Sequence, residues 1–390
     1  MRIGIDATCW ANPRGYGRFT RHMLTALLAM DRENEYVFFM DTLTAASARL
    51  PDNAEQVLVK LSESPTRAAS ADSRRGIVDM FRMGRRVSRE PLDVFFFPSV
   101  YTYFPVWGPF RKVVAIHDVI AEKYPELIFK SRKNRLFWDL KTRLAVRQSD
   151  LVMTVSEFSK QGIVEHFGLP EERVMVVTEG SADSFGVVND RDRLVGALSA
   201  CGLAVDTRFI LYVGGIAPHK NLAVLVRAFT ALTQLPDYAD VKLVLVGDYR
   251  DDVFLIDEKL RADMDNPAFR DKVIFTGYLP DEQLNGLYNA AQVFVLPSFC
   301  EGFGLPALEA MSCGTVVIGS STTSVPEVVG DAGLFFDPRS ETELVERLRT
   351  LLDDDRLCEA LGRRSLERAA AFSWEQSAAD ALGIFRAATD

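Results

Sequence analysis

Short apolar runs that alternate with helical patterns constrain the fold of this chain more than any other feature. They form two blocks, one ending before residue 185 and one beginning after residue 208. Strand-like runs separated by helical segments are typical of parallel α/β sheets, and 390 residues with 48% apolar content can supply two cores. We therefore expect an α/β protein with two doubly wound parallel-sheet domains. The expected strands are Arg2–Asp6, Tyr36–Met40, Gln56–Lys60, Asp93–Phe97, Lys112–Ile116, Leu151–Val155 and Arg173–Val177, then Phe209–Val213, Val241–Val246, Lys272–Thr276, Val293–Pro297, Thr315–Ile318 and Gly333–Phe336.

The stretch from Gly180 to Thr207 interrupts this rhythm with Ser, Asp, Gly and Asn residues. We place the domain junction near residue 185, which gives a first domain of residues 1–185 and a second of residues 186–372. The remaining segment, 373–390, has a helical pattern. Another helix is expected over four apolar residues at helical spacing, Leu136, Phe137, Leu140 and Leu144.

Charge is unevenly distributed along the chain, whose net charge is −9. Residues 1–185 carry 26 Lys/Arg and 23 Asp/Glu, whereas residues 186–390 carry 19 and 31, a net of +3 against −12. The basic residues gather between Lys130 and Arg147 and at Arg74, Arg75, Arg82, Arg85, Arg86 and Arg89. The simpler interpretation of these basic clusters is that they are solvated helix faces. The more specific interpretation is that they face a phosphate-bearing acceptor or an anionic membrane surface. Around the second cluster, Ser62–Glu90 is either a mobile loop or a basic amphipathic helix over an active-site cleft.

Other classes of protein receive little support. No apolar run reaches 18 residues and the chain opens as a strand, so we expect a soluble cytosolic protein whose basic first half is a candidate for peripheral membrane contact. The histidines are scattered and the five cysteines lack metal or redox spacing, so we expect reduced thiols and no metal. These residues are Cys9, Cys201, Cys300, Cys313 and Cys358, and His22, His117, His166 and His219.

The most informative motif is Cys300–Glu309, which follows the apolar run Val293–Pro297. Its glycines allow close approach of backbone amides to a ligand, and Pro306 suits the first turn of a helix. Helix N-terminal amides favour an anion such as a diphosphate. Glu301 and Glu309 flank that site and could accept hydrogen bonds from hydroxyl groups. A sugar nucleotide has both a diphosphate and hydroxyl groups.

The two acids differ in their alternative interpretations. Glu309 could reach a ribose, or could simply be a favourable acid in the first helical turn. Glu301 lies between an apolar strand and a glycine turn, where a carboxylate gains little structurally, so a functional role is favoured. We expect both Glu301 and Lys220 to occupy loop positions outside a core.

Three further strand ends carry candidate residues, because open parallel sheets bind ligands beyond the carboxyl ends of their strands. After the first strand, Gly15 and Gly17 permit close approach of a phosphate or sugar, although the dinucleotide fingerprint is incomplete. His117 follows another strand and could donate to a hydroxyl or shuttle a proton, or could be a structural residue bonded to backbone or to Asp118.

After Phe209–Val213, the third strand end carries Gly214 and Gly215, and Lys220 follows at a helix N-terminus. A lysine there suits a diphosphate leaving group, although a loop lysine is more often only solvated.

Together these motifs resemble glycosyltransferase family 4, the retaining enzymes of the GT-B fold. The resemblance covers most of the chain. It is strongest over Tyr212–Leu222 and Gly277–Pro338, where the pair Glu301 and Glu309 matches the family's E-x7-E motif. Three segments in the first half also resemble motifs of this family: His117-Asp118, Val155–Ser159 and the Arg14–Arg18 loop.

The resemblance implies that the second domain binds a nucleotide-diphosphate sugar and the first binds a saccharide or lipid-linked acceptor. Lys220 would neutralise the diphosphate, Glu309 would bind the ribose, and Glu301 would hold the donor sugar. His117 would meet that sugar from across the cleft. The implied catalytic residues are His117, Lys220 and Glu301, and the implied donor-binding residues are Gly15, Gly17, Arg18, Gly214, Gly215, Lys220, Phe303, Gly304, Leu305 and Glu309.

The resemblance also implies retention of anomeric configuration, no metal or cofactor, and a terminal helix that packs back on the first domain. One departure from the family is Gly215, where many relatives have an arginine. Lys220 then acts without a second cation unless a residue such as Arg18 substitutes.

Other functions stay open at this point. A metal-dependent transferase would use an Asp-x-Asp pair, and Asp190/Asp192 and Asp263/Asp265 have that spacing, although each lies in a polar junction or helical stretch. A sugar-nucleotide epimerase, a phosphorylase with a pyridoxal-bearing lysine and a non-enzymatic sugar-binding protein are the remaining alternatives.

Overall fold

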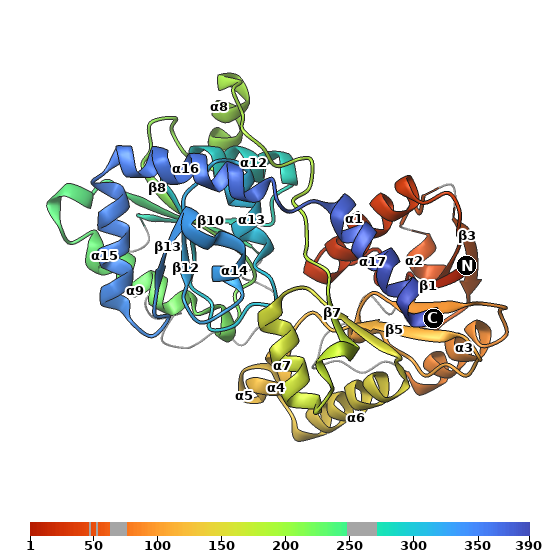
Figure 1. Cartoon of the computed structure of the whole chain (residues 1–390). Helices are drawn as coiled ribbons and strands as arrows, with labels where there is room; N and C mark the ends of the chain where they lie inside the picture. Colours follow the sequence, from red (N-terminus) through yellow and green to blue (C-terminus); the bar gives the residue numbers. More distant parts are fainter. Residues whose placement is uncertain (47, 52–53, 63–75, 248–270) are drawn as a thin grey trace. The chain divides into compact units, whose positions relative to one another are not determined.

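The computed structural model describes residues 1–46, 48–51, 54–62, 76–247 and 271–390. The chain forms two compact units (Figure 1). The first comprises Met1–Glu179 together with Ser373–Asp390, and the second comprises Gly180–Phe372. The boundary therefore precedes residue 185, because Phe185 is buried in the second unit with its ring edge-on to that of Tyr288, 5.8 Å between centroids.

The described part of the first unit contains a seven-stranded parallel sheet in the order β3-β2-β1-β4-β5-β6-β7. Its strands are β1 (Arg2–Asp6), β2 (Glu35–Asp41), β3 (Glu55–Val59), β4 (Val94–Phe97), β5 (Arg111–Ala115), β6 (Leu151–Thr154) and β7 (Val174–Val176). Runs such as Val-Phe-Phe-Phe in β4 are buried on both faces, as parallel strands between helix layers must be. The parallel sheet predicted for the first domain is confirmed.

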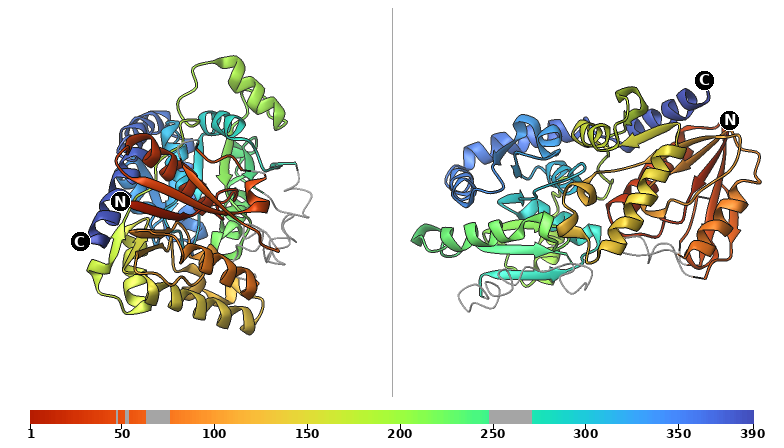
Figure 2. Two further views of the ribbon diagram at one scale, coloured as in Figure 1. Left: turned by 90° about the vertical axis from the view of Figure 1, so that its right-hand side faces the viewer. Right: turned by 90° about the horizontal axis from the view of Figure 1, so that it is seen from below.

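Helices cover both faces of this sheet (Figures 1 and 2). They are α1 (Gly15–Met30), α2 (Thr42–Ala45), α3 (Ile77–Val87), α4 (Ile120–Lys123), α5 (Pro125–Ile128), α6 (Arg132–Gln148), α7 (Glu157–Phe167) and α17 (Trp374–Thr389), with the 3-10 turns η1 (Val100–Thr102) and η2 (Glu171–Arg173). One face packs against α3, α6 and α7, and Phe95 and Phe97 lie in that core. Phe96 points to the other face, where it contacts Phe385 of α17, and α17 packs along α1.

The structure bears on two sequence predictions about this unit. Within Ser62–Glu90, for which the sequence leaves a loop and a basic helix open, the described residues include the helix α3, and Arg74 and Arg75 lie outside the described residues. The helix α6 forms as expected, but its inward side chains include Trp138, Thr142 and Ala145, whereas Leu136 and Leu140 are exposed. Leucine spacing identified the helix and not its buried side, because an aromatic residue and small residues fill the space over the sheet.

The described part of the second unit contains a six-stranded parallel sheet in the order β10-β9-β8-β11-β12-β13. Its strands are β8 (Phe209–Val213), β9 (Lys242–Val246), β10 (Val273–Gly277), β11 (Val293–Leu296), β12 (Val317–Ser320) and β13 (Gly333–Phe336). Its helices are α8 (Arg191–Ala200), α9 (Leu222–Leu232), α12 (Asp281–Ala290), α13 (Leu305–Ser312), α14 (Val325–Val329), α15 (Glu341–Leu352) and α16 (Asp355–Ala369), with the 3-10 turns η3 (Pro218–Lys220), η4 (Pro236–Tyr238) and η5 (Gly330–Ala332).

Both sheets have a point where the strand order reverses, between β1 and β4 and between β8 and β11. Loops leave such a pair of neighbouring strands in opposite directions, and the resulting crevice beyond their carboxyl ends is where doubly wound sheets bind ligands. In the second unit, the loops after β8 and β11 carry Lys220 and Glu301. The topology thus places the two main candidate residues at one point.

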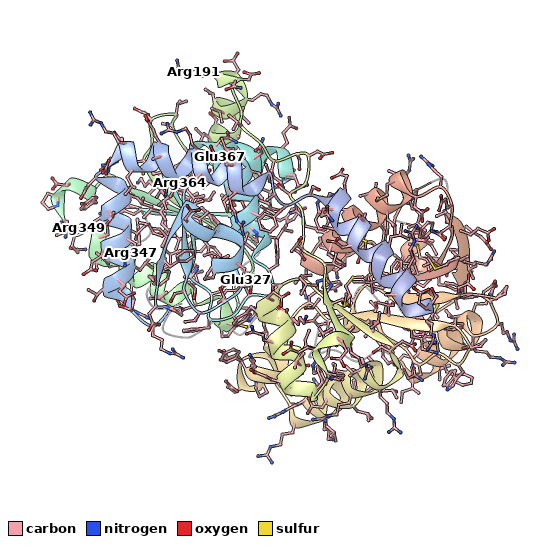
Figure 3. The ribbon with its side chains drawn as sticks, in the orientation of Figure 1. Arg191, Glu327, Arg347, Arg349, Arg364 and Glu367 are labelled. Atoms are coloured by element: carbon pink, nitrogen blue, oxygen red, sulfur yellow. The ribbon has the colours of Figure 1, made fainter. Side chains whose placement is uncertain are left out.

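The outer helices of the second unit carry charges of both signs. Arg191 on α8, Arg349 on α15, and Arg364 and Glu367 on α16 are exposed (Figure 3). Within the part of the chain that the structure describes, no helix combines the length and the apolar character needed to span a membrane.

Candidate functional site

Lys220 and Glu301 form an ion pair at the strand-order reversal of the second sheet. The Lys220 Nζ lies 2.9 Å from both carboxylate oxygens of Glu301. The Glu301 side chain is 8% exposed and that of Lys220 is 24% exposed. A charge-assisted contact to both oxygens fixes the ammonium and the carboxylate relative to each other. The structure therefore brings together two residues that the sequence could only place on separate loops.

The turn that carries Glu301 is held by two serines. The Ser298 hydroxyl donates to the Glu301 carboxylate, and the Ser324 hydroxyl lies 3.0 Å from the Glu301 carbonyl oxygen and 2.9 Å from that of Phe303. Glu301 lies in a loop as expected, but it is buried, so the expectation that it lies outside a core is wrong. The carboxylate gains structural stabilisation from Lys220 and Ser298, which sequence analysis missed.

Helix α13 begins at the same turn. Gly304 precedes it with φ +102°, a left-handed conformation that disfavours other residues, and a Cβ there would lie 3.3 Å from Val325 Cγ2. Phe303 and Leu305 on either side are buried. The positive end of the α13 dipole thus adjoins Glu301 and suits an anion.

Glu309 lies in the second turn of α13, so the alternative that it serves as a first-turn acid is wrong. It is 2% exposed, and the Tyr288 hydroxyl donates to its Oε2 at 3.0 Å. Tyr288 is a partner that sequence analysis did not identify. The ribose-binding role of Glu309 stays a prediction.

Two polar side chains anchor the loop after β8. Tyr212 is buried and its hydroxyl donates to the Gly215 carbonyl at 2.9 Å; burial, with a smaller contribution from the Glu301 charge, raises the Tyr212 pKa. Asn221 adopts a left-handed conformation, and its Nδ2 donates to the carbonyls of Pro297 and Pro338 at 3.0 and 2.7 Å. The Asn221 amide ties this loop to the end of β11. An Asn directly after the lysine at a helix start was the available signal.

His219 directly precedes Lys220 in the same loop. Among the described residues its Nδ1 is buried and has no hydrogen-bond partner. Burial, together with the Lys220 charge, lowers its pKa to about 4, with Glu301 partly opposing this. The ring is therefore neutral near pH 7.

This depressed pKa predicts a pH-dependent stability. The unfolded histidine binds a proton near pH 6.5 and the folded one only near pH 4, so the stabilisation is complete above pH 6.5 and is lost as pH falls toward 4. Between pH 7.5 and pH 5 we expect His219 to account for a loss of about 2 kcal/mol. Thermal unfolding of the wild type and of His219→Gln at both pH values measures it. Equal losses in both proteins would contradict the assignment.

His117 stands at the carboxyl edge of the first sheet, after β5. Its Nε2 lies 2.9 Å from the Pro98 carbonyl oxygen, and its Nδ1 lies 3.8 Å from Oε1 of Glu179. A carbonyl oxygen only accepts, so Nε2 carries a proton. Phe19 packs edge-on to the ring at 4.8 Å. Glu179 is a buried partner that sequence analysis missed, although an acid preceding Gly180 just beyond a strand was a usable signal. Asp118 instead accepts from the backbone amide of Ile120.

The loop after β1 is tightly closed. A Cβ at Gly17 would lie 2.1 Å from the Asn12 carbonyl oxygen, so this position requires glycine, whereas Gly15 has open space. Arg18 lies in the first turn of α1. The Tyr16 ring stacks on Tyr101 at 5.1 Å, which adds an aromatic surface at this edge. These residues and His117 belong to the first unit and the Lys220 group belongs to the second.

Metal ligation receives no support from the described residues, which contain no group of three or more His, Cys, Asp and Glu suited to an ion. Asp190 caps α8 by accepting from the amides of Asp192 and Arg193. Asp263 and Asp265 lie outside the described residues.

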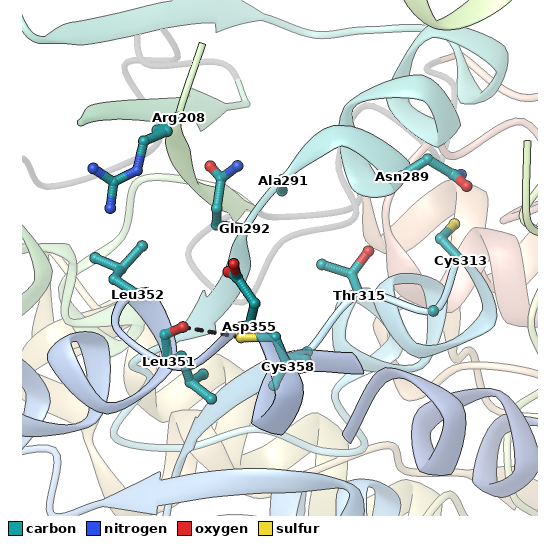
Figure 4. A pocket seen from close by; sticks show the side chains of 12 residues that line it. Arg208, Asn289, Ala291, Gln292, Cys313, Thr315, Leu351, Leu352, Asp355 and Cys358 are labelled. Carbon is teal, nitrogen blue, oxygen red and sulfur yellow. Dashed lines mark hydrogen bonds between the residues drawn. The ribbon is translucent and has the colours of Figure 1, made fainter. Parts of the chain in front are cut away.

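A cavity of about 480 Å³ lies at the opposite edge of the second sheet (Figure 4). Arg208, Gln292 and Val316, which precede β8, β11 and β12, line it. It lies at the amino ends of the strands, so it is separate from the Lys220–Glu301 pair.

Comparisons with known proteins agree with this architecture. Residues 200–368 match the family model for glycosyl transferases group 1, and residues 13–181 match the model for glycosyltransferase family 4. The O-antigen chain mannosyltransferase B of Escherichia coli is 34% identical over 280 residues, covering 71% of this chain and 70% of that protein. The serotype-specific mannosyltransferase WbdA of Escherichia coli is 29% identical over 270 residues, 69% of this chain but 32% of that protein.

Solved structures share the fold. Sucrose-phosphate synthase from Thermosynechococcus elongatus has a TM-score of 0.75 and 20% identity, covering 99% of this chain and 98% of that one. Anabaena HepE in complex with UDP and glucose has a TM-score of 0.72 and 17% identity, covering 99% and 100%. The paired parallel sheets and these matches define a glycosyltransferase of the GT-B fold. The chain belongs to glycosyltransferase family 4.

Proposed function

We propose that this enzyme transfers a hexose, with retention and without a metal, from a nucleotide-diphosphate sugar to a hydroxyl of a saccharide or lipid-linked saccharide in glycoconjugate biosynthesis. The observation that carries the proposal is the Lys220–Glu301 pair at the strand-order reversal, beside the N-terminus of α13. Relatives named as mannosyltransferases make mannose the first donor sugar to test.

The chemistry follows from where charge develops. Cleavage of the anomeric bond leaves negative charge on the diphosphate, and the Lys220 ammonium and the α13 amides stabilise it there. Glu301 positions that ammonium and offers its remaining acceptor capacity to sugar hydroxyls. The leaving phosphate accepts the proton of the acceptor hydroxyl as this oxygen attacks on the same face. Two acids beside a diphosphate site thus need not serve as a glycosidase acid and base.

Metal independence gives a direct prediction. Because Lys220 and helix amides take the place of a divalent cation on the diphosphate, transfer should continue in EDTA at an unchanged rate. The measurement is acceptor-dependent consumption of a panel of nucleotide sugars, with the anomeric configuration of the product read by NMR. Loss of activity in EDTA that Mg²⁺ or Mn²⁺ restores would contradict metal independence. Donor turnover without an acceptor would favour an epimerase or a hydrolase instead.

A further inference from the structure

The outward side of α3 and α6 exposes large apolar side chains. On α3, Ile77 is 76% exposed, Val78 63% and Phe81 55%, and on α6, Leu136 is 71% exposed and Leu140 66%. Isolated exposed apolar residues are common on soluble proteins, but a group on two helices of one layer marks an interaction surface.

The segment after η1 joins the two helices into one surface. The Tyr103 hydroxyl donates to Gln148 at the end of α6, and the Trp107 amide donates to Ser88 Oγ at the end of α3, at 2.6 and 2.8 Å. The Trp107 side chain is itself 53% exposed and its ring centroid lies 5.8 Å from that of Phe81. We call this the α3–α6 surface; both helices lie on the same side of the sheet in Figure 1.

Basic side chains share the outward stripes with the apolar ones. Exposed residues recur at helical spacing on each helix, as Val78, Phe81, Arg82, Arg85 and Arg89 along α3 and its C-terminal extension and as Lys133, Leu136, Leu140, Arg143 and Arg147 on α6. The two helices carry nine Lys/Arg and two Asp/Glu. One of those acids, Asp79, is buried and accepts from Ser62. Helices α15 and α16 together carry six basic and six acidic residues, so the basic excess on α3 and α6 is not shared by that exposed pair of helices.

The α3–α6 surface combines exposed apolar side chains with basic ones, although the net charge of the chain is −9. These two features complement a lipid bilayer whose headgroups are anionic and whose interior is apolar. We propose that the α3–α6 surface docks on a bilayer containing anionic lipid. The apolar side chains enter the boundary between headgroups and acyl chains, and the Lys and Arg residues bind the lipid phosphates.

The orientation of the helices connects this surface to the site. Helices α3 and α6 lead back into parallel strands, so their N-terminal turns lie toward the carboxyl edge of the sheet, where His117 stands. The apolar residues Ile77, Phe81 and Leu136 occupy those N-terminal halves. Docking brings that edge to the lipid surface. Docking on a bilayer favours a lipid-linked saccharide among the acceptors left open above. This inference about the acceptor rests on the proposed function.

Vesicle flotation of the full chain without substrates tests the docking. We expect binding to phosphatidylcholine vesicles only when they contain phosphatidylglycerol, and weaker binding as salt rises. The variant Arg85→Glu/Lys133→Glu should bind at least about thirtyfold more weakly, since each basic residue near the surface contributes roughly 1 kcal/mol. Leu136→Ser/Leu140→Ser should also lose binding. The control Arg356→Glu/Arg363→Glu, which reverses two exposed charges on α16, should bind as the wild type does.

Three outcomes overturn the proposal. They are equal binding to neutral vesicles, unchanged binding by both surface variants, and a wild-type dimer that Leu136→Ser/Leu140→Ser dissociates without any vesicle binding, which would make this face a contact between copies. Transfer to a water-soluble saccharide is measured separately and should be unchanged in all these variants. Absence of transfer both to a water-soluble saccharide and to a lipid-linked saccharide in detergent, alongside intact vesicle binding, would refute the proposed function and leave the docking intact.

Discussion

Replacing Lys220 with alanine is expected to lower kcat/KM by about 10²–10³, the effect of removing one preorganised group that stabilises developing charge. The same change should destabilise the protein by about 2 to 3 kcal/mol, because it leaves the Glu301 carboxylate buried without its cation. The two effects are measured by steady-state kinetics and by thermal unfolding. Lys242→Ala, at the amino end of β9, is the control and should change neither.

A double variant separates stability from catalysis. Adding Glu301→Gln to Lys220→Ala removes both charges, so most of the lost stability should return. Transfer should stay lost, because neither the ammonium proposed to stabilise the diphosphate nor the carboxylate proposed to bind the sugar is restored. Near-normal kcat/KM in Lys220→Ala would refute its catalytic role. Recovery of transfer in the double variant would show that the single variant failed only through the stranded carboxylate.

Replacing His117 with alanine should lower kcat/KM by about 10². This is the lower end of the rate contribution of a positioned acid or base, and it applies if His117 acts at the donor sugar as the resemblance implies. The ring is fixed between the Pro98 carbonyl, Glu179 and Phe19, so its orientation is set before substrate binds. His166→Ala on α7 is the control and should retain normal transfer.

Glu179→Gln tests the same assembly from the other side. Glutamine keeps the shape and a hydrogen-bonding oxygen but removes the charge that faces Nδ1. We expect a smaller loss, roughly tenfold in kcat/KM, because the ring keeps its bond to Pro98. Normal transfer in His117→Ala, with reduced thermal stability, would instead make His117 a structural residue that holds the end of β4.

The strands were predictable because their patterns are local. Runs such as Val293–Leu296 are apolar throughout, and a buried parallel strand requires no more than that. The order of the strands then follows from the doubly wound topology, and the order places the loops of Lys220 and Glu301 together. Sequence reasoning therefore reached the two loops that converge at the Lys220–Glu301 pair, and their role in binding a donor stays a prediction.

The contacts inside the site were not predictable, because they depend on side chains distant in sequence. Glu301 contacts Lys220 only because two loops converge. Glu309 on α13 accepts a hydrogen bond from Tyr288, which lies on another helix, α12. Similarly, no periodicity could show that Asn221 reaches two carbonyls from other loops. The buried side of α6 was not predictable for a related reason: leucine spacing reports an apolar stripe and not what covers it.

The first unit is assembled from both ends of the chain, since α17 lies on α1 and buries Trp374, Ala378 and Phe385 there. During synthesis the first 179 residues leave the ribosome long before their final helix exists. Until then Phe96 lacks its cover from Phe385, so the first unit completes its core only after the whole second unit, Gly180–Phe372, has been made. Chains that end at Phe372 lack α17, so they should stay bound to chaperones. Full-length chains should be released from the chaperones once α17 has packed.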